Sequence, residues 1–291
     1  MLDLDLQREG PAARDASTLI VARNATAGGI EVFCVERQKV GFLGGAVVFP
    51  GGKLDPGDLD PEWERFATPP RPTRTPIARD DAALRGLAIA ACREALEEAA
   101  ILPIAGPAAS HADLLAWRKA LASGTETLRS LLGARGLLLD LASLHALARW
   151  VTPIAEARRF DTRFFLFVSD GATRGAHDDH ETTASFWASP SDVLEKHAAR
   201  ALVLAPPTHR TLQVLAGARD TAEAVAIADA SCLEPICPRV VQQHEAEGDT
   251  IAIVLPGDPE HDVRDVRVPG SSRYVLRGGR FWPEGAPARR P

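Results

Sequence analysis

The segment from Arg79 to Ala100 carries a strong helix signal, and it limits what this chain can fold into. Apolar residues recur along it at spacings of three and four, which gives a helix one apolar face for burial. Acidic residues occupy its first turn, where they suit the helix dipole, and Pro103 stands beyond its end. We therefore expect a long helix that packs against a sizeable core.

Strand signals flank this helix on both sides. Ser17 to Val35 predicts two strands around a turn at Asn24 to Gly29, and residues 46–49 predict a short strand between glycines. Phe160 to Val168 is dense in aromatic and branched residues, as is typical of a buried strand. The other expected elements are a strand through Trp187, helices starting at Ser191 and Pro206, a strand at 250–255 and a hairpin at 273–282.

Two segments around the helix are harder to interpret. Residues 59–77 contain five prolines, which exclude a continuous helix there. Residues 108–148 show further helical patterns, broken at Gly124 and around 133–136. Trp63, within the proline-rich stretch, is either a local packing anchor or a side chain that stacks on a base.

Charge and composition exclude several classes of function. The 33 Lys and Arg against 39 Asp and Glu give a net charge of −6, which argues against general affinity for nucleic acid. No apolar run reaches the roughly 18–20 residues that span a membrane, and the first ten residues lack the features of a secretory signal. We expect a cytoplasmic protein that binds neither nucleic acid nor membrane. Cys232 and Cys237 are expected to be buried structural thiols.

Three carboxylates share one face of the expected helix. Glu94, Glu97 and Glu98 stand at positions i, i+3 and i+4, where like charges repel by a few tenths of a kcal/mol per pair. One explanation is a solvated acidic face on which Arg93 pairs with Glu97. The other is a site for a divalent cation such as Mg²⁺, which prefers oxygen ligands and often binds carboxylates together with substrate phosphates.

These carboxylates and the glycine turn upstream resemble the signature of the Nudix hydrolase family. That signature reads G-x5-E-x7-R-E-U-x-E-E-x-G-U, in which U is a bulky aliphatic residue. The matching positions are Gly52 for the first glycine, Asp58 for the first acid, Arg93-Glu94 for the R-E pair, Glu97-Glu98 for the E-E pair and Ile101 for the last aliphatic residue.

The match departs from the signature in four places. Asp58 replaces Glu and keeps the charge, whereas Ala95 and Ala100 replace a bulky aliphatic residue and a glycine in ways compatible with a helix. Residues 59–92 form a gap of 34 residues where the signature has 7. Closing a longer loop adds only about 1 kcal/mol of entropy cost, so a fold can tolerate this insertion.

The interrupted signature is similar to that of a Nudix subgroup that includes peroxisomal coenzyme A diphosphatases. Other marks of the subgroup have counterparts here, and together the resemblance covers about residues 17–215. These counterparts are G-x3-F-P-G-G at 45–52, W-x-T-P at 150–153, R-R-F-D-T at 158–162 and P-P-T at 206–208.

The resemblance implies an α/β fold of the Nudix type. This is an α/β/α sandwich with a mixed sheet between helices, here with a helical insertion and a β-rich C-terminal extension. We expect an N-terminal arm at 1–16, a Nudix hydrolase domain at 17–235 with an insertion at about 59–92, and a C-terminal extension at 236–291.

The resemblance also implies a metal site. Glu97, Glu98 and the carbonyl of Gly51 would bind Mg²⁺ or Mn²⁺, and Glu94 would join the metal shell or orient water. Arg93 would brace the carboxylates by ion pairing. The implied catalytic set is therefore Glu94, Glu98 and Arg93, together with a general base.

The general base varies within the family and often lies on a later loop. Here the polar loop from Asp170 to Glu181 offers Glu181 as the candidate, although an exposed acidic loop is often simply solvated. Arg158 and Arg159 are candidates for binding a phosphate group of the substrate in bidentate geometry. They fit equally well as surface residues beside a strand.

The resemblance implies metal-dependent hydrolysis of a diphosphate bond in a small nucleotide substrate, in which a nucleoside diphosphate is linked to another group. A coenzyme A species is the favoured substrate. The alternatives are an ADP-ribose or dinucleotide pyrophosphatase, and a Nudix-fold sensor that binds a nucleotide without turnover. The family also suggests a homodimer.

Overall fold

The computed structural model describes residues 10–38, 44–107, 109–178, 180–245 and 248–285. An eight-stranded mixed sheet forms the centre, in the order β10-β3-β2-β1-β8-β7, with β4 paired to β1 and β9 paired to β2. β1 and β8 run parallel over nine residue pairs, and β1 and β2 run antiparallel. Its strands are β1 (Arg14–Asn24), β2 (Ile30–Arg37), β3 (Ala46–Val48), β4 (Gly51–Lys53), β7 (His145–Val151), β8 (Phe160–Val168), β9 (Thr182–Ala188) and β10 (Val203–Leu204).

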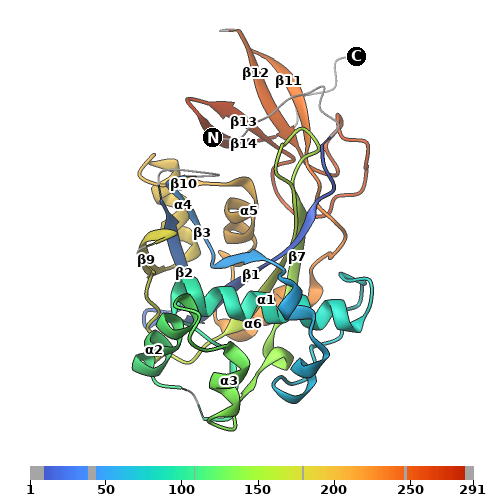
Figure 1. Cartoon of the computed structure of the whole chain (residues 1–291). Helices are drawn as coiled ribbons and strands as arrows, with labels where there is room; N and C mark the ends of the chain where they lie inside the picture. The colour runs from blue at the N-terminus through green and yellow to red at the C-terminus, as the bar shows by residue number, and fades with distance from the viewer. Residues whose placement is uncertain (1–9, 39–43, 108, 179, 246–247, 286–291) are drawn as a thin grey trace.

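Helices cover both faces of this sheet, as the α/β/α sandwich predicts (Figure 1). Because side chains alternate along a strand, Leu19 of β1 joins the core under one set of helices and Ile20 joins the core under the other. The first set is α1 (Asp81–Ala99), α2 (His111–Ala122) and α3 (Leu128–Gly133), and the second set is α4 (Pro190–Ala198), α5 (Pro206–Leu215) and α6 (Thr221–Ala230).

Both ends of α1 are fixed by local contacts. The Asp80 carboxylate accepts a hydrogen bond from the amide of Ala83 at 2.7 Å, which caps the first turn. At the other end, Ala100 has φ 51° and ψ 42°, a left-handed conformation that favours glycine. The expectation that alanine continues the helix here is therefore wrong, because position 100 reverses the chain instead. This conformation accounts for the glycine in the family signature.

The segment between β4 and α1 holds two short 3-10 helices, η1 (Pro56–Leu59) and η2 (Pro61–Arg65), and no continuous helix among its residues. Trp63 is buried, and its indole N–H donates to the carbonyl of Gly57 at 2.9 Å. The packing-anchor interpretation of Trp63 is therefore confirmed. α1 begins at Asp81, so the last part of the gap at 59–92 is helix of the core.

The helical interpretation of residues 108–148 is confirmed for α2 and α3 and is wrong beyond them. Residues 138–139 form β6, which pairs with β5 (Ile104–Ala105), and residues 141–143 form a 3-10 turn, η3 (Leu141–Ser143). β7 then pairs antiparallel with β8. The Ala- and Leu-rich sequence favours helix locally, but pairing at the sheet edge buries Leu147 and Trp150 and decides the outcome.

The C-terminal region forms a four-stranded antiparallel sheet, as the β-rich extension predicts. Its strands are β11 (Arg239–Glu245), β12 (Gly248–Val254), β13 (Arg273–Arg277) and β14 (Arg280–Glu284). The hairpin at Gly278-Gly279 is confirmed, and both glycines have positive φ. At the other end of the chain β1 begins at Arg14, whose amide donates to the carbonyl of Arg159. Residues 14–16 of the expected arm thus belong to the sheet, and residues 1–9 lie outside the described residues.

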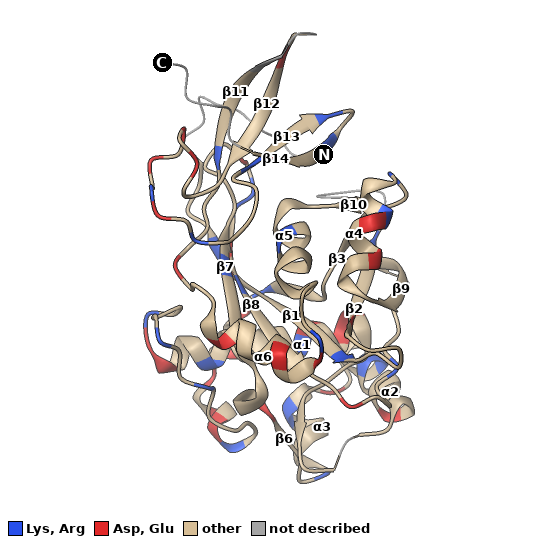
Figure 2. Ribbon diagram, turned by 180° about the vertical axis from the view of Figure 1, so that it is seen from behind, with Lys and Arg blue, Asp and Glu red and all other residues tan. Residues whose placement is uncertain are grey.

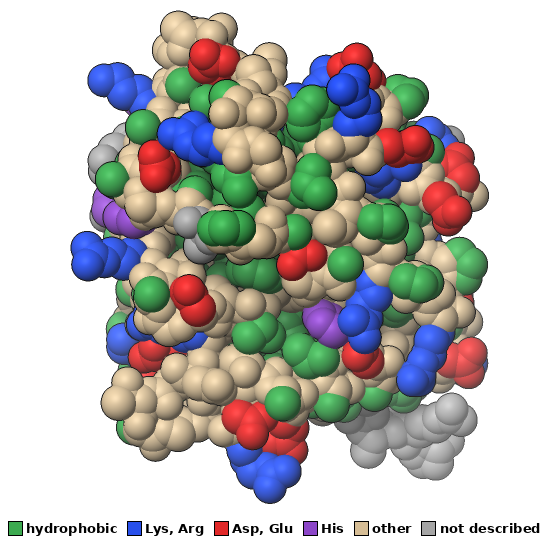
Figure 3. Space-filling view, turned by 90° about the horizontal axis from the view of Figure 1, so that it is seen from below, with side chains coloured by type: hydrophobic (Ala, Val, Ile, Leu, Met, Phe, Trp, Pro, Cys, Tyr) green, Lys and Arg blue, Asp and Glu red, His purple; other side chains and the backbone are tan. Residues whose placement is uncertain are grey.

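Charged side chains are spread over the molecule. Acidic and basic positions are interspersed over the described ribbon, and the face seen from below mixes acidic, basic and apolar side chains (Figures 2 and 3). That the chain binds no nucleic acid stays a prediction. No helix in the described ranges combines the length and the apolar character needed to cross a membrane.

An aromatic and histidine cluster joins the C-terminal sheet to α4 and α5, and we predict that it makes stability sensitive to acid. His209 Nδ1 lies 3.0 Å from the Tyr274 hydroxyl, and His197 stacks on Trp282. Burial, with the nearby charges of His197 and Arg210, lowers the pKa of His209 to about 4. Because the fold prefers the neutral ring, this contribution to stability is present above pH 6.5 and is lost as the pH falls towards 4.

Urea unfolding measures this effect. We expect His209 to account for about 1–2 kcal/mol of the stability lost between pH 7 and pH 5. The variant His209→Gln, which cannot titrate, should lose correspondingly less over the same interval. Equal losses in the two proteins would contradict the assignment to His209.

Candidate active site

A close approach between β4 and α1 builds the candidate site. β4 pairs with the first half of β1, which sets Gly51 opposite Thr18 and Gly52 opposite Ser17. The amide of Gly51 donates to Glu98 Oε2 at 3.0 Å. A Cβ on Gly52 would overlap the Glu94 carboxylate, and one on Gly51 would overlap the backbone of β1. Glycine is needed at both positions for the helix carboxylates to lie against the strand.

Arg93 is the centre of the ionic network at this site. Its guanidinium donates to both carboxylate oxygens of Asp58 at 3.0 Å, in the bidentate geometry that favours specific pairing. One of its nitrogens also donates to Glu94 at 2.9 Å and to Glu97 at 3.2 Å, and another donates to the carbonyl of Lys53. The structure therefore places Asp58 and Arg93 together across the insertion.

The two explanations of the acidic face can now be separated. Arg93 pairs with Glu97, whose side chain is 39% exposed, as a solvated face would require. Glu98 is only 4% exposed, and Glu94 is also shielded. A solvated face thus describes Glu97 but not Glu94 or Glu98. Burying two neighbouring carboxylates costs free energy unless a positive charge offsets them.

The pKa values reflect that cost. Burial is the main cause of the raised pKa of Glu98, about 8, to which the charges of Glu94 and Glu181 add and which the Gly51 amide opposes. Burial likewise raises the pKa of Glu94 to about 7, although the adjacent Arg93 lowers it. The pKa of Glu97 is also raised by burial. A cation bound beside these groups would favour their ionised forms.

Glu181 lies near this cluster although it is far away in the sequence. The Asp178 carboxylate accepts hydrogen bonds from the amides of His180, Glu181 and Thr182, which shapes the end of the loop. The Glu181 side chain is 67% exposed, lies 4.0 Å from Arg37, and acts on the pKa values of Glu94 and Glu98. Its placement suits a group that meets water and substrate.

The donor set fits a hard divalent cation. Within the described ranges no three His, Cys, Asp or Glu side chains converge closely enough to hold a metal as they stand, because Arg93 and the Gly51 amide engage the carboxylates. The donors are nonetheless all oxygen, Glu98 is buried, and the lack of a Cβ on Gly52 gives the Glu94 carboxylate its place beside β4. The Gly51 carbonyl as a ligand stays a prediction.

The two candidate phosphate-binding arginines lie differently. Arg159 donates to the carbonyls of Thr152 at 3.1 Å and Pro11 at 2.8 Å, so it supports the start of β8. Arg158 is exposed, and its role stays a prediction. Sequence reasoning missed Arg37, whose charge acts on Glu98 and whose guanidinium lies near Glu181. A lone arginine at a strand end carries no sequence signal of this contact.

We predict that Gly52→Ala lowers metal affinity without unfolding the protein. The added Cβ would collide with the end of the flexible Glu94 side chain, which can move away, but only by leaving its place beside β4. Calorimetric titration with Mn²⁺ should show affinity reduced by about tenfold, the lower end of the range for loss of ligand positioning. Gly57→Ala is the matched control, since its Cβ would meet nothing within 4 Å. Unchanged affinity in Gly52→Ala would contradict the placement of the metal at Glu94.

Comparison with known proteins agrees with this geometry. Residues 65–215 match the family model described as the NUDT19 Nudix domain. The chain is 29% identical over 221 residues to acyl-coenzyme A diphosphatase NUDT19 of Gallus gallus, a match covering 60% of this chain and 58% of the relative. For the Homo sapiens protein of the same name the identity is 28% over 238 residues, covering 67% and 63%. The chain thus spans about three fifths of the length of these relatives.

A solved structure extends the comparison to the fold. The crystal structure of a NUDIX hydrolase from Alicyclobacillus acidocaldarius is 33% identical, with a TM-score of 0.60, and the match covers 74% of this chain and 96% of that one. The sequence signature, the arrangement of β4 and α1, and these matches lead to one conclusion. The chain belongs to the Nudix hydrolase family.

Proposed function

We propose that this chain hydrolyses the diphosphate bond of a coenzyme A species with the help of Mg²⁺ or Mn²⁺. The observation that carries the proposal is a pair of carboxylates, the buried Glu98 and the partly buried Glu94, held against the Gly51-Gly52 turn. The name of the chicken and human relatives, acyl-coenzyme A diphosphatase, supports the choice of substrate. Nudix hydrolases generally use divalent metals, and the oxygen donors here suit either ion.

Glu94, Glu97 and Glu98 would hold the metal, together with the Gly51 carbonyl. A divalent ion bound there neutralises diphosphate oxygens and makes a bound water more acidic. Arg93 keeps the carboxylates in place through its contacts with Asp58, Glu94 and Glu97, and so acts as a positioning residue.

Glu181 is the group that we assign to accept the proton of the attacking water. The water oxygen bonds to phosphorus, the bond from that phosphorus to the bridging oxygen breaks, and two monophosphate-type fragments leave. Arg37, which lies near Glu181, would offer positive charge to the phosphates, and we assign the same role to the exposed Arg158. An exposed carboxylate at the rim of a buried acidic cluster is well placed to meet water.

A substrate panel tests the proposal. Coenzyme A, a short acyl-coenzyme A, ADP-ribose and NADH are incubated with the protein and Mg²⁺ or Mn²⁺, and the products are separated by chromatography. We expect the coenzyme A species to be cleaved fastest. Preference for ADP-ribose or NADH would favour the pyrophosphatase alternative. No cleavage, combined with a raised Tm for one nucleotide, would favour the sensor.

We predict that Mn²⁺ raises the Tm more at pH 8 than at pH 6. At pH 6 protons occupy Glu94 and Glu98, whose pKa values are about 7 and about 8, and the metal must displace them. In the metal-free protein the raised pKa values of Glu94 and Glu98 have the opposite effect, because they make the fold less stable as the pH rises. Their contribution to stability is fully present below pH 4.5 and is lost as the pH rises through 7 and 8.

Scanning fluorimetry with and without Mn²⁺ measures both effects. In Glu98→Gln the difference between the Mn²⁺ shifts at the two pH values should shrink. Equal shifts for the unchanged protein at pH 6 and pH 8 would contradict binding at these carboxylates.

The assembly and location of the protein are also part of the proposal. A homodimer is carried over from the family resemblance, and light scattering coupled to size exclusion tests it. A cytoplasmic location rests on the acidic composition and on only four cysteines in 291 residues, and cell fractionation tests it.

A further inference from the structure

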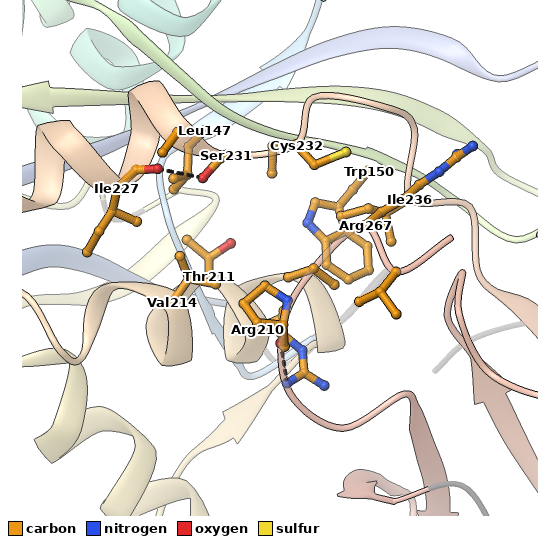
Figure 4. Close-up of a pocket in the computed structure, with 15 residues that line it drawn as sticks. Leu147, Trp150, Arg210, Thr211, Val214, Ile227, Ser231, Cys232, Ile236 and Arg267 are labelled. Atoms are coloured by element: carbon orange, nitrogen blue, oxygen red, sulfur yellow. Dashed lines mark hydrogen bonds between the residues drawn. The ribbon is translucent and has the colours of Figure 1, made fainter. Parts of the chain in front are cut away.

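A pocket of about 450 Å³ lies on the face of the sheet opposite α1 and its carboxylates (Figure 4). Its volume falls within the range of roughly 300–1,000 Å³ that small-molecule sites occupy. β7, α5, α6 and two segments around residues 231–236 and 266–269 form its walls. Trp150, Val214, Ile227, Ile236 and Val268 make most of this wall apolar.

One charged residue in the wall lacks a counter-charge. Arg210 is 1% exposed, and its hydrogen bonds go to the neutral oxygens of Gln213, Pro269 and Ser271. Its guanidinium carbon also lies 5.4 Å from the centre of the Tyr274 ring, which carries no formal charge. Its Nε has no hydrogen-bond partner in the described part of the chain. Burying a guanidinium without an opposite charge is costly, so such groups are normally paired.

Other buried arginines of this protein follow that rule. Arg163 pairs with Asp15 and Asp161, and Arg273 pairs with Asp258 at 2.7 Å and with Glu260. The described residues provide no ion pair for Arg210. A second arginine of the pocket, Arg267, donates to the carbonyl of Pro235, which is also neutral. Two guanidiniums thus border one apolar pocket without a carboxylate bonded to either.

The mouth of the pocket is open to ligands. Val266 is 69% exposed although it is apolar, and Cys232 is exposed at the same rim. The expectation that Cys232 is buried is therefore wrong, because the chain leaves α6 there along the surface, and Cys237 is only half-buried.

We propose that this pocket binds a small amphipathic anion, an aliphatic chain with one carboxylate or phosphate head. The chain would cover the apolar wall, and the head would supply the negative charge that Arg210 lacks. The site stands on residues that the carboxylate helix does not use and on the other face of the sheet. It does not depend on the proposed diphosphatase activity.

Calorimetric titration of the full chain tests the ligand chemistry. Octanoate and octyl phosphate supply the two head groups, 1-octanol supplies the chain alone, and propanoate supplies a head with almost no chain. We expect one or both octyl anions to bind about tenfold or more tightly than either 1-octanol or propanoate, a difference of about 1.4 kcal/mol. If 1-octanol bound as tightly as the octyl anions, the arginines would not contribute to binding. If propanoate bound as tightly as the octyl anions, the apolar wall would not contribute.

A pair of variants on α6 tests the location. Ala230 is exposed and lines the pocket, so Ala230→Trp should fill the space and weaken binding of the octyl anion by about tenfold or more. Ala226→Trp places the same side chain one turn earlier, at an exposed position outside the pocket, and should leave binding unchanged. Equal affinities in the two variants would overturn the assignment.

The thiol at the rim gives a local readout that does not require a variant of the wall. In a Cys237→Ser background, Cys34 and Cys92 are buried and Cys232 is the remaining exposed thiol. Saturating octyl anion should slow alkylation of Cys232 several-fold. An unchanged rate at saturation would place the ligand elsewhere and overturn the proposal.

Discussion

Glu98→Gln is expected to lower turnover of the preferred diphosphate substrate by about 10³-fold or more while the protein remains folded. Loss of one charged ligand removes several kcal/mol of stabilisation from a metal-assisted transition state, and each 1.4 kcal/mol is tenfold in rate. Glutamine keeps the shape of the side chain and still accepts a hydrogen bond from the Gly51 amide. Steady-state kinetics at saturating Mg²⁺, with the substrate chosen by the panel, measures the effect.

Stability provides the check on this result. Because Glu98 is buried and its pKa is about 8, an uncharged replacement should leave the metal-free protein as stable as before or more stable at pH 8. Glu195→Gln, at an exposed position on α4, is the matched control and should keep full activity. If Glu98→Gln retained turnover, Glu98 would be excluded as a catalytic metal ligand.

Arg93→Met is expected to destabilise the protein by about 3–5 kcal/mol, the usual cost of removing one partner from a buried ionic network. The substitution leaves Asp58, which is almost fully buried, without the guanidinium that engages both of its oxygens. It also leaves Glu94 and Glu97 without their shared cation. Urea unfolding at pH 7.5 measures the loss.

Two further variants test whether the stability depends on the hydrogen-bond network of Arg93 or only on its charge. Arg93→Lys keeps the charge but cannot bridge both oxygens of Asp58, so it should recover only part of the lost stability. Arg79→Met removes an arginine just before α1 whose ion pair with Asp80 is exposed, and it should cost less than about 1 kcal/mol. A similar cost for Arg79→Met and Arg93→Met would mean that Arg93 is an ordinary surface residue.

The parts of the fold that were predictable from sequence are those fixed by local pattern. Arg79 to Ala100 became α1 within two residues at each end, because periodicity and the Asp80 cap act within the helix itself. Residues 160–168 became β8 with the same bounds, since a dense run of branched and aromatic residues has few alternatives. β7 was missed because its strand state depends on pairing with β8, which no local pattern shows.

The same distinction holds for the site. Glu94, Glu97 and Glu98 could be placed together because helix geometry alone brings them to one face. The bond from Gly51 to Glu98, the overlap that excludes a Cβ at Gly52, and the nearness of Arg37 are contacts between distant segments. Arg159 was ambiguous because its bonds to backbone carbonyls depend on how the chain enters β8.

The ion pair between Asp58 and Arg93 joins the two ends of a detour in the chain. Asp58 precedes the proline-rich stretch and Arg93 follows it, so the bidentate contact closes the stretch into a loop whose base is held rigidly. A change in the length of that loop therefore need not move the carboxylates on α1. The helix that carries the carboxylates and the loop can thus vary independently, and residues 71–76, none of which is buried, are a place where a designed segment could be inserted without moving that helix.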